Sequence, residues 1–542
     1  MDPTPYSVAM AMTAAAVAKA LAERGIRKAF GLPGGEVLVL IDELRKAGID
    51  FVLMRHEANA GIAAAVYGKL HQQPGVVIAT LGPGAANLML PIANAYLDQE
   101  PLLAITAQIP DDFPPSHTHQ LLPLLDSFRP MCKMAGKLTC TNAIETVHHA
   151  LDACMERPLG ASYVTLSARE ATKPMAPGSL SKNGHPTARL FTQGDVRSTA
   201  LSLEAKLGKA ERPLVLVGLG TDSRNADRLR QWLTQWNLPV AVTPKVKGIV
   251  DETAPNFVGV ISGMAADGLM VEALNASDLL IGVGLDPVEV DKTWHAELAI
   301  EWLLESPNTG DRIPDSTALV QHAALLEALS KTPPPRNWTQ PFAEVQKKRR
   351  DLLTGAASAP GTMWPGDLIR ALSDAVPADT IVTTDVGSHK YLFGQFWPSR
   401  HPDTFWMSNG LSGMAYGLSA ALGAKLARPQ SPVLAAVGDG GFSMNAQELE
   451  SAERVGAPFV TVVLEDGSYS LIKLAQENRK LEPYRMDFGQ IDNVKMAQSC
   501  GVEALRTADP RELVEAVRRA IEQRKSLVAA VPVHYADYRK LF

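Results

Sequence analysis

Short apolar runs alternate with helical patterns along almost the whole chain. The clearest runs are GVVIATLGPG (75–84), PLVLVGLG (213–220), DLLIGVGLD (278–286) and TIVTTDVGSH (380–389). They are rich in β-branched residues and contain glycine at or near their ends, and apolar residues at helical spacing lie between such runs. This alternation predicts an α/β chain built from doubly wound parallel sheets.

Two changes in composition divide the pattern into three blocks. One is TKPMAPGSLSKNGHPTARLFT, which starts at Thr172, and the other extends from KTPPPRNWTQP through GAASAPGTMWPGD. Segments rich in Pro, Gly and polar residues without periodicity are typical of linkers. We therefore predict domains at 1–175, 190–332 and 360–542. The first and third blocks resemble each other in design, as an ancient duplication would leave them.

Composition narrows the class of protein. The chain has 542 residues, of which 46% are hydrophobic and 20% charged, and a net charge of −6 without long runs of either sign. These values are typical of a soluble globular protein with several domains and predict neither a nucleic-acid nor a membrane partner. The four cysteines lack the spacing of a zinc site or a disulfide framework. The first residues lack a basic leader, and no apolar run reaches membrane-spanning length, so we expect a cytoplasmic protein.

The stretch GDGGFSMNAQELESAERVGAPFVTVVLEDGSYS (438–470) carries the most specific chemistry. It predicts a strand, a glycine turn, a helix and a second strand, so Asp439 and the EDGS loop would meet at the carboxyl edge of a parallel sheet. The carboxylates of Asp439 and Asp466 and the carbonyl of Ser468 suit Mg²⁺, which takes few carboxylates together with substrate phosphates. Gly440 and Gly441 permit a tight turn whose amides can meet phosphate oxygens.

A GDG turn followed at this distance by such a loop resembles the signature of thiamine diphosphate enzymes, in particular the acetolactate synthase and benzoylformate decarboxylase branch. The resemblance implies thiamine diphosphate and Mg²⁺ as cofactors, and it adds Tyr469 to the residues that contact them. Three residues depart from the family pattern: Glu465, Asp466 in place of Asn, and Ser470 in place of Gly. We expect the metal site to persist with altered affinity. The family also implies pyrimidine-binding, central and diphosphate-binding domains, in that order.

The first block places Glu57 in FVLMRHEANAG, between an apolar strand and a helix of small residues. In the family the matching glutamate contacts N1′ of the aminopyrimidine, where it favours the imino tautomer whose nitrogen takes the C2 proton. The resemblance therefore implies that Glu57 is a catalytic residue. It also places Pro83 and Asn87, in the turn LGPGAANL, near the pyrimidine and the reacting centre.

The third block supplies two further motifs. In DVGSH, the resemblance implies that Gly387, Ser388 and His389 meet the diphosphate. In SNGLSGMAYGLSAALGAKLA, Met414 takes the position of the apolar wedge between the cofactor rings, with its amide near N3′. The carbonyl of Ser412, where Gly is usual, would accept from the 4′-amino group.

The segment SHTHQLLPLLDSFRP contains His119 and Gln120. They match a pair that lies close to the reacting substrate in acetolactate synthases. An imidazole there could stabilise negative charge on the substrate oxygen or transfer a proton. We count both as candidate catalytic residues.

The chemistry expected from the resemblance is decarboxylation of a pyruvate-like 2-oxo acid, followed by ligation to a second acceptor. FGQIDNVKMAQSCG (488–501) and GLDPVEVDKTW (284–294) are similar to fermentative acetolactate synthases, which makes FAD unlikely. SLIKLAQE (470–477) is also similar to carboxyethylarginine synthase. A non-ligating decarboxylase or lyase, a specialised synthase of that kind, and a non-catalytic homologue stay open as alternatives. The family further implies a homodimer or homotetramer in which Glu57 of one subunit shares a site with Asp439 of another.

Overall fold

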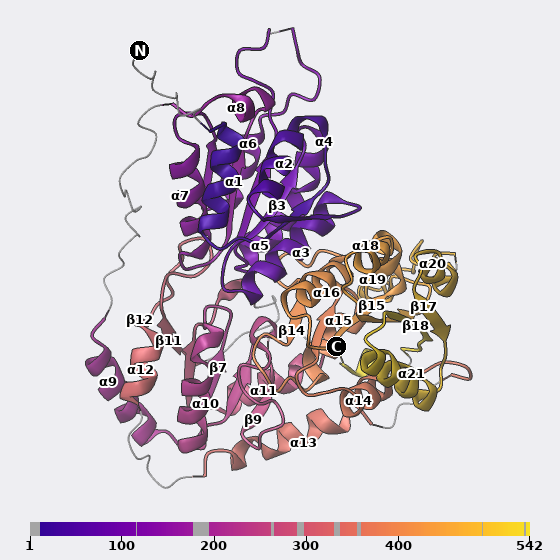
Figure 1. Ribbon diagram of the computed structural model, residues 1–542. Helices are drawn as coiled ribbons and strands as arrows, with labels where there is room; N and C mark the ends of the chain where they lie inside the picture. The colour runs from indigo at the N-terminus through magenta and orange to yellow at the C-terminus, as the bar shows by residue number, and fades with distance from the viewer. Residues whose placement is uncertain are drawn as a thin grey trace, which may run out of the picture. The chain divides into compact units, whose positions relative to one another are not determined.

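Three parallel sheets of six strands each form the framework of the computed structural model (Figure 1). It describes residues 11–114, 116–176, 194–261, 265–289, 298–329, 337–354, 359–489, 491–535 and 538–541. Helices lie between the strands along the chain, which confirms the predicted fold class of three doubly wound parallel sheets. Much of both predicted linkers lies outside the described residues.

The first sheet belongs to a compact unit that spans residues 1–189. Its strand order is β2-β1-β3-β4-β6-β5. The strands are β1 (Lys28–Gly31), β2 (Asp50–Leu53), β3 (Gly75–Ala79), β4 (Leu102–Thr106), β5 (Met134–Lys137) and β6 (Ala161–Thr165). Every residue of β3, β4 and β6 is buried, as expected of parallel strands covered on both faces. The helices are α1 (Thr13–Glu23), α2 (Leu38–Lys46), α3 (Glu57–Leu70), α4 (Pro83–Asn87), α5 (Met89–Leu97), α6 (Leu124–Phe128), α7 (Ala143–Met155) and α8 (Ala168–Thr172).

The third sheet repeats the connectivity of the first, with the order β14-β13-β15-β16-β18-β17. Its strands are β13 (Ile381–Thr384), β14 (Phe405–Met407), β15 (Val433–Gly438), β16 (Val460–Glu465), β17 (Glu503–Arg506) and β18 (Leu527–Pro532). Numbered from its own first strand, each of the two sheets has the order 2-1-3-4-6-5. This identity supports the duplication that the sequence pattern suggested.

Eight α-helices of the third block accompany this sheet. They are α14 (Pro365–Ala375), α15 (Ser388–Phe396), α16 (Tyr416–Ala427), α17 (Asp439–Asn445), α18 (Glu448–Arg454), α19 (Ser470–Asn478), α20 (Asn493–Ser499) and α21 (Pro510–Gln523). The single helix expected after the GDG turn is divided into α17 and α18, and α17 already begins at Asp439. Gly456, with φ of 65°, follows the end of α18, as is common for a glycine after a helix.

The middle sheet has the order β12-β11-β10-β7-β8-β9. Its strands are β7 (Pro213–Val217), β8 (Val240–Val242), β9 (Phe257–Val260), β10 (Leu279–Val283), β11 (Ile300–Leu304) and β12 (Thr317–Leu319). The helices around it are α9 (Val196–Lys209), α10 (Ala226–Gln235), α11 (Asp267–Ala276), α12 (His322–Ala328) and α13 (Ala343–Asp351).

A carboxylate from elsewhere in the chain binds the glycine turn that follows β7. The amide of Leu219 donates to Oε2 of Glu289 at 2.7 Å, and Glu289 is buried. A methyl group on Gly218 would come within 2.5 Å of Cα of Leu285. The carboxylate of Glu289 thus accepts from an amide that a bound phosphate would otherwise use, which indicates a structural turn and not a dinucleotide-binding one.

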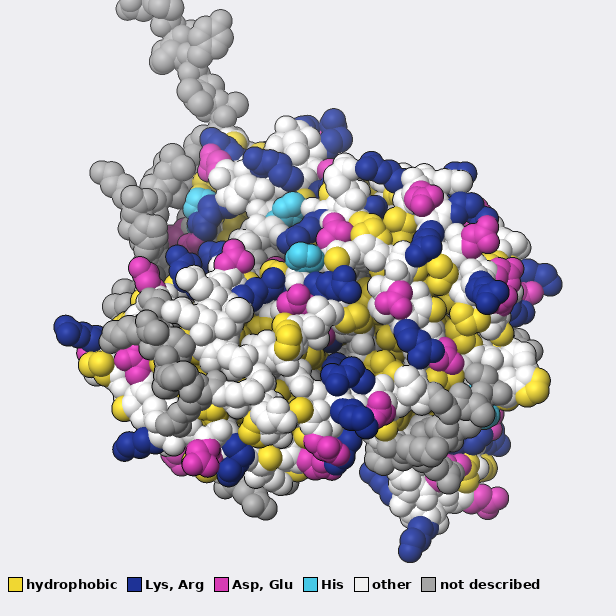
Figure 2. All heavy atoms as spheres, turned by 90° about the horizontal axis from the view of Figure 1, so that it is seen from below, with side chains coloured by type: hydrophobic (Ala, Val, Ile, Leu, Met, Phe, Trp, Pro, Cys, Tyr) yellow, Lys and Arg dark blue, Asp and Glu magenta, His cyan; other side chains and the backbone are white. Residues whose placement is uncertain are grey.

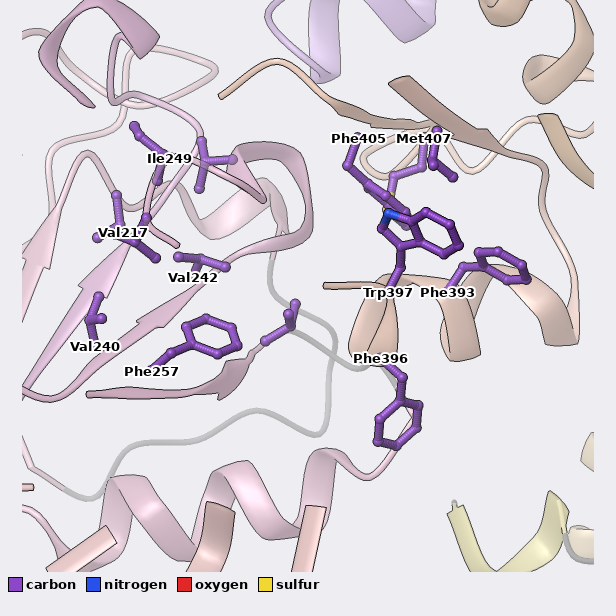
Figure 3. Close-up of a cluster of buried hydrophobic side chains, with 14 of the residues drawn as sticks. Val217, Val240, Val242, Ile249, Phe257, Phe393, Phe396, Trp397, Phe405 and Met407 are labelled. Atoms are coloured by element: carbon purple, nitrogen blue, oxygen red, sulfur yellow. The ribbon is translucent and has the colours of Figure 1, made fainter. Parts of the chain in front are cut away.

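The middle and third sheets lie in one compact unit, residues 190–542, and share a hydrophobic core (Figure 3). Residues of the cluster from both blocks are Val217, Val240, Val242, Ile249, Phe257, Phe393, Phe396, Trp397, Phe405 and Met407. A buried ion pair reinforces the contact, since Nζ of Lys247 lies against Glu252 and also donates to the carbonyl of Trp397 at 2.9 Å. The third sheet is therefore held against a rigid neighbour.

The surface carries charges of both signs. On the face drawn in Figure 2, Lys and Arg side chains are interspersed with Asp and Glu side chains. In the part of the chain that the structure describes, no helix combines the length and apolar character needed to cross a bilayer.

Candidate active site

A pocket of about 110 Å³ lies at the carboxyl edge of the third sheet. The strands β13, β15 and β16 are neighbours there, so the segments that follow them converge. Of the residues predicted from sequence, the pocket is lined by Gly387, Ser388, His389, Met414, Asp439, Gly440, Gly441, Asp466, Ser468 and Tyr469. Segments far apart in the chain, from Gly387 to Tyr469, thus form one site.

Two carboxylates form the acidic side of the pocket. Asp439 accepts from the amides of Gly440 and Gly467, each at 2.8 Å. Asp466 accepts from the hydroxyl of Ser470 and, at 3.3 Å, from the amide of Ser468. Burial raises the pKa of Asp466 to about 6, although Ser470 opposes the shift, and the charge of Asp439 adds to it. Burial also raises the pKa of Asp439. The pair therefore has unfavourable negative charge that a cation would neutralise.

This donor set fits Mg²⁺ bound together with a diphosphate. Among the described residues, no group of three or more His, Cys, Asp and Glu side chains could hold a metal ion by itself. Mg²⁺ commonly takes one or two carboxylates and completes its octahedron with phosphate oxygens and water. Asp439, Asp466 and the carbonyl of Ser468 could hold it in this way.

The opposite side of the pocket carries polar groups that lack partners. Oγ of Ser388 and Nε2 of His389 are buried and make no hydrogen bond with any described residue. Burial lowers the pKa of His389 to about 3, so the imidazole is neutral. Both residues open α15, whose N-terminal amides favour an anion. Since buried polar groups are nearly always satisfied, the pair indicates a ligand with hydrogen-bonding oxygens.

Two glycines of the pocket are required by close packing. A methyl group on Gly438 would lie 2.8 Å from Cε1 of His389, and one on Gly440 would lie 3.0 Å from the ring of Tyr469. Side chains at these positions would displace the imidazole or fill the pocket. The glycines therefore keep the backbone open toward a ligand.

Asp385 connects two segments of the site, a role that the sequence pattern did not predict. Its Oδ1 accepts from the amides of Val386 at 2.8 Å and Tyr416 at 3.2 Å. It thereby joins the loop after β13 to the start of α16. Burial raises the pKa of Asp385 to about 6. Its position at the end of a buried strand is the signal that could have identified it.

Met414 lies in the pocket, and its methyl group would be 3.7 Å from a methyl placed on Gly440. Ser412 is outside the pocket lining and adopts φ of 55°. Its hydroxyl accepts from Nζ of Lys390 at 2.9 Å and donates to the carbonyl of Asn409 at 2.9 Å. These hydrogen bonds accommodate a serine in a conformation that favours glycine.

Glu465, one of the departures from the family pattern, takes part in an ion pair. Its carboxylate accepts from Nδ2 of Asn493 at 2.8 Å and from Nε of Arg506 at 2.9 Å. Neither partner lines the pocket. Glu465 thus fixes the end of β16 and the start of the EDGS loop, and it has a structural role.

Two segments that the sequence pattern did not place at the site contribute to it, one beside the EDGS loop (465–468) and one from the C-terminal end. The amide of Tyr469 donates to the carbonyl of Met486 at 2.9 Å, and the amide of Phe488 donates to Gly467 at 3.0 Å. From the C-terminal end, Tyr535 lines the same pocket. Tyr538 donates through its hydroxyl to the carbonyl of Ser388 at 3.0 Å.

The first unit brings together a second group of predicted residues. Glu57 begins α3, is buried, and accepts at Oε2 from Nδ2 of Asn87 at 2.9 Å. Pro83 and Asn87 are the first and last residues of the short helix α4. A methyl group on Gly84 would lie 3.2 Å from Oε1 of Glu57. The carboxylate of Glu57 thus lies between α3 and α4, and Gly84 leaves room for it.

Gln120 lies beside this group, whereas the structure gives His119 no comparable contact. A methyl group on Gly82 would meet Cβ of Gln120 at 2.8 Å, and Gln120 adopts φ of 57°. Both His119 and Gln120 are exposed.

Comparison with family models matches three regions of the chain. Residues 12–127 match the N-terminal TPP binding domain of thiamine pyrophosphate enzymes, residues 203–326 their central domain, and residues 385–531 their C-terminal TPP binding domain. Glu57 falls in the first region, and the pocket residues from Val386 to Ser470 fall in the third.

Curated relatives match over most of the chain. An acetolactate synthase of Bacillus subtilis is 29% identical over 550 residues, covering 96% of this chain and 93% of the relative. The large subunit of acetolactate synthase isozyme 2 of Escherichia coli is 30% identical over 500 residues, covering 85% and 84%. A catabolic acetolactate synthase of Raoultella terrigena is 27% identical over 555 residues, covering 99% and 98%.

Proposed function

Because this chain belongs to the thiamine pyrophosphate enzymes and is of the acetolactate synthase type, we propose that it decarboxylates a pyruvate-like 2-oxo acid and ligates the product to a second 2-oxo acid. We further propose that Mg²⁺ accompanies the cofactor. The observation that carries the proposal is the pocket in which the acidic pair Asp439 and Asp466 lies with the unpartnered polar atoms of Ser388 and His389.

Bound thiamine diphosphate would supply the nucleophilic carbon and the electron sink of the reaction. The protein's contribution is then binding and proton transfer. Ser388 and His389 would hold the diphosphate from one side, and Asp439, Asp466 and the carbonyl of Ser468 would hold its metal from the other. The side chain of Met414 would orient the rings.

Glu57 would control the proton on the aminopyrimidine. Asn87 donates to Oε2, which leaves Oε1 as the oxygen that shares a proton with N1′. General acid–base catalysis by a positioned carboxylate contributes about 10²–10⁴-fold to a rate. We propose that His119 and Gln120 act on the substrate instead of on the cofactor.

We propose that the enzyme is a homodimer or a larger homo-oligomer in which Glu57 of one subunit serves the pocket of another. The support comes from the family, whose paired subunits share their sites. We also propose that FAD is not required. The carboxylate of Glu289 on the glycine turn of the middle sheet supports this, because it already takes the amide of Leu219.

Incubation of the purified protein with pyruvate, thiamine diphosphate and Mg²⁺ tests the proposal. We expect carbon dioxide and acetolactate. Release of an aldehyde instead would identify a non-ligating decarboxylase, and a different acceptor, such as an amine, would identify a specialised synthase. Failure to turn over any 2-oxo acid in a panel would favour a non-catalytic homologue.

A further inference from the structure

A buried lysine connects the two parts of the cofactor pocket. Lys390 is only 2% exposed, and its Nζ donates to Oγ of Ser412 at 2.9 Å. It lies in the first turn of α15, directly after Ser388 and His389, the residues proposed to hold the diphosphate. Ser412 lies in the segment before α16 that presents Met414. One side chain therefore connects the diphosphate side of the site to the side proposed for the pyrimidine.

The conformation of Ser412 depends on this contact. Its φ of 55° lies in the left-handed region, which costs free energy for any residue except glycine. Its hydroxyl is fixed at both ends, by Lys390 as donor and by the carbonyl of Asn409 as acceptor. Side-chain hydrogen bonds of this kind select one backbone conformation, and with it one direction of the Ser412 carbonyl.

Burying an ammonium group costs free energy, because burial removes its hydration. A hydrogen bond to a charged donor is stronger than a neutral one and more directional in effect. Lys390 also acts on its surroundings electrostatically, since its charge lowers the pKa of both Asp385 and His389. A buried charge thus lies between the start of α15 and Ser412.

We propose that Lys390 is a positioning residue that acts through Ser412 to aim the Ser412 carbonyl at the 4′-amino group of the cofactor. This inference rests on the proposed function and adds a residue to it. Neither Lys390 nor Ser412 is among the residues that line the pocket, whereas Met414, which follows in the same segment, is. Lys390 is therefore assigned a positioning role through Ser412, beside its electrostatic effect on Asp385 and His389.

Binding of two ligands separates this role from simple support of the fold. Thiamine diphosphate and its 4′-desamino analogue share the diphosphate and differ only at the group that the Ser412 carbonyl would meet. Their affinities in the presence of Mg²⁺ are measured by quenching of tryptophan fluorescence or by calorimetry, without any turnover. In Lys390→Met we expect the preference for thiamine diphosphate over the analogue to fall about tenfold, the value of one hydrogen bond to a well-placed acceptor.

Two further variants complete the test. Ser412→Ala should lower the preference by the same factor, and the double variant should lower it no further, because both changes break one connection. Lys425→Met is the matched control, since Lys425 is also a buried lysine but donates to the carbonyl of Ser431, at 3.0 Å, and not to the segment that presents Met414. It should leave the preference unchanged.

Equal losses of affinity for both ligands in Lys390→Met, or no loss, would overturn the inference while leaving the proposed function in place. Wild-type protein that binds neither ligand with Mg²⁺ would instead overturn the proposed function, and this inference with it.

Discussion

Gly441 packs so closely on Asp385 that a methyl group at position 441 would lie 1.9 Å from Oδ2 of Asp385. Gly441 directly follows the GDG turn after β15, and Asp385 directly follows β13, the strand next to β15 in the sheet. Because Oδ1 of Asp385 holds the amides of Val386 and Tyr416, a shift of this carboxylate would move two sides of the pocket together.

Gly441→Ala should therefore remove cofactor binding and destabilise the protein by about 1–3 kcal/mol, the usual cost of overpacking a filled interior. Urea unfolding and titration with thiamine diphosphate measure the two effects. Gly268→Ala is the control, because a methyl group there meets nothing within 4 Å. Normal cofactor binding by Gly441→Ala would contradict the role given to this contact.

Glu57→Gln should lower kcat by at least about 10²-fold, because an amide cannot exchange the proton that a carboxylate shares with N1′. It keeps the shape of the side chain, so Mg²⁺-dependent cofactor binding should change little. Rates with pyruvate and calorimetric binding would be compared. Wild-type rates in this variant would refute a catalytic role for Glu57.

Asp466 should make the stability of the cofactor-free protein depend on pH. The pKa of Asp466 in the folded chain, about 6, is above its ordinary value of 3.8, so the folded state holds a proton that the unfolded state releases between these values. Stability therefore falls as pH rises through this window. Asp466→Asn should be more stable than wild type at pH 7, on the order of 1–2 kcal/mol, and the difference should vanish near pH 4.

The variant Asp466→Asn also tests the affinity of the site for Mg²⁺. A proton and Mg²⁺ compete for the carboxylate of Asp466, so the affinity for Mg²⁺ should fall as pH drops below about 6. In Asp466→Asn this decline should be weaker, and Asp439 should account for what is left. Calorimetric titration with Mg²⁺ and thiamine diphosphate between pH 5 and 8 measures both proteins. An equal pH dependence in the two would exclude Asp466 as the titrating ligand.

Mixed oligomers test whether the site is shared between subunits. Glu57→Gln and Asp439→Asn should each be inactive alone. When they are co-expressed, a mixed dimer would contain one site with both wild-type residues, so random pairing should restore about a quarter of the activity. Sites confined to one chain would give no recovery. Co-expression of Glu57→Gln with itself under a second tag is the control.

Lys247 and Glu252 form a buried pair between the middle and third sheets. Lys247→Met should destabilise the protein by about 3–5 kcal/mol, because it leaves the carboxylate of Glu252 buried without a counter-ion. A double variant, Lys247→Met with Glu252→Leu, should recover part of the loss. Chemical unfolding at several pH values measures all three proteins, and a single variant as stable as wild type would contradict the expectation.

The fold class, and the positions at which the site residues follow strands, could be predicted from the residues along the chain. Its information was local. A run of β-branched residues, a glycine turn and a helical pattern place Asp439, Ser388 and Glu57 at strand ends whatever the distant chain does, and parallel sheets collect such ends at one edge. The resemblance of the GDG stretch to thiamine diphosphate enzymes then identified the chemistry.

The contacts of the neighbouring side chains, in contrast, became known from the three-dimensional arrangement. Glu465 belongs to the EDGS stretch in the sequence, but in the fold it pairs with Arg506, from a strand 41 residues later. Glu289 closes a turn 70 residues earlier, and Lys390 reaches Ser412 across 22 residues. Contacts of this kind depend on which strands become neighbours and how closely their loops pack. The spacing of residues along the chain does not specify that packing, so these contacts could not be predicted from the sequence alone.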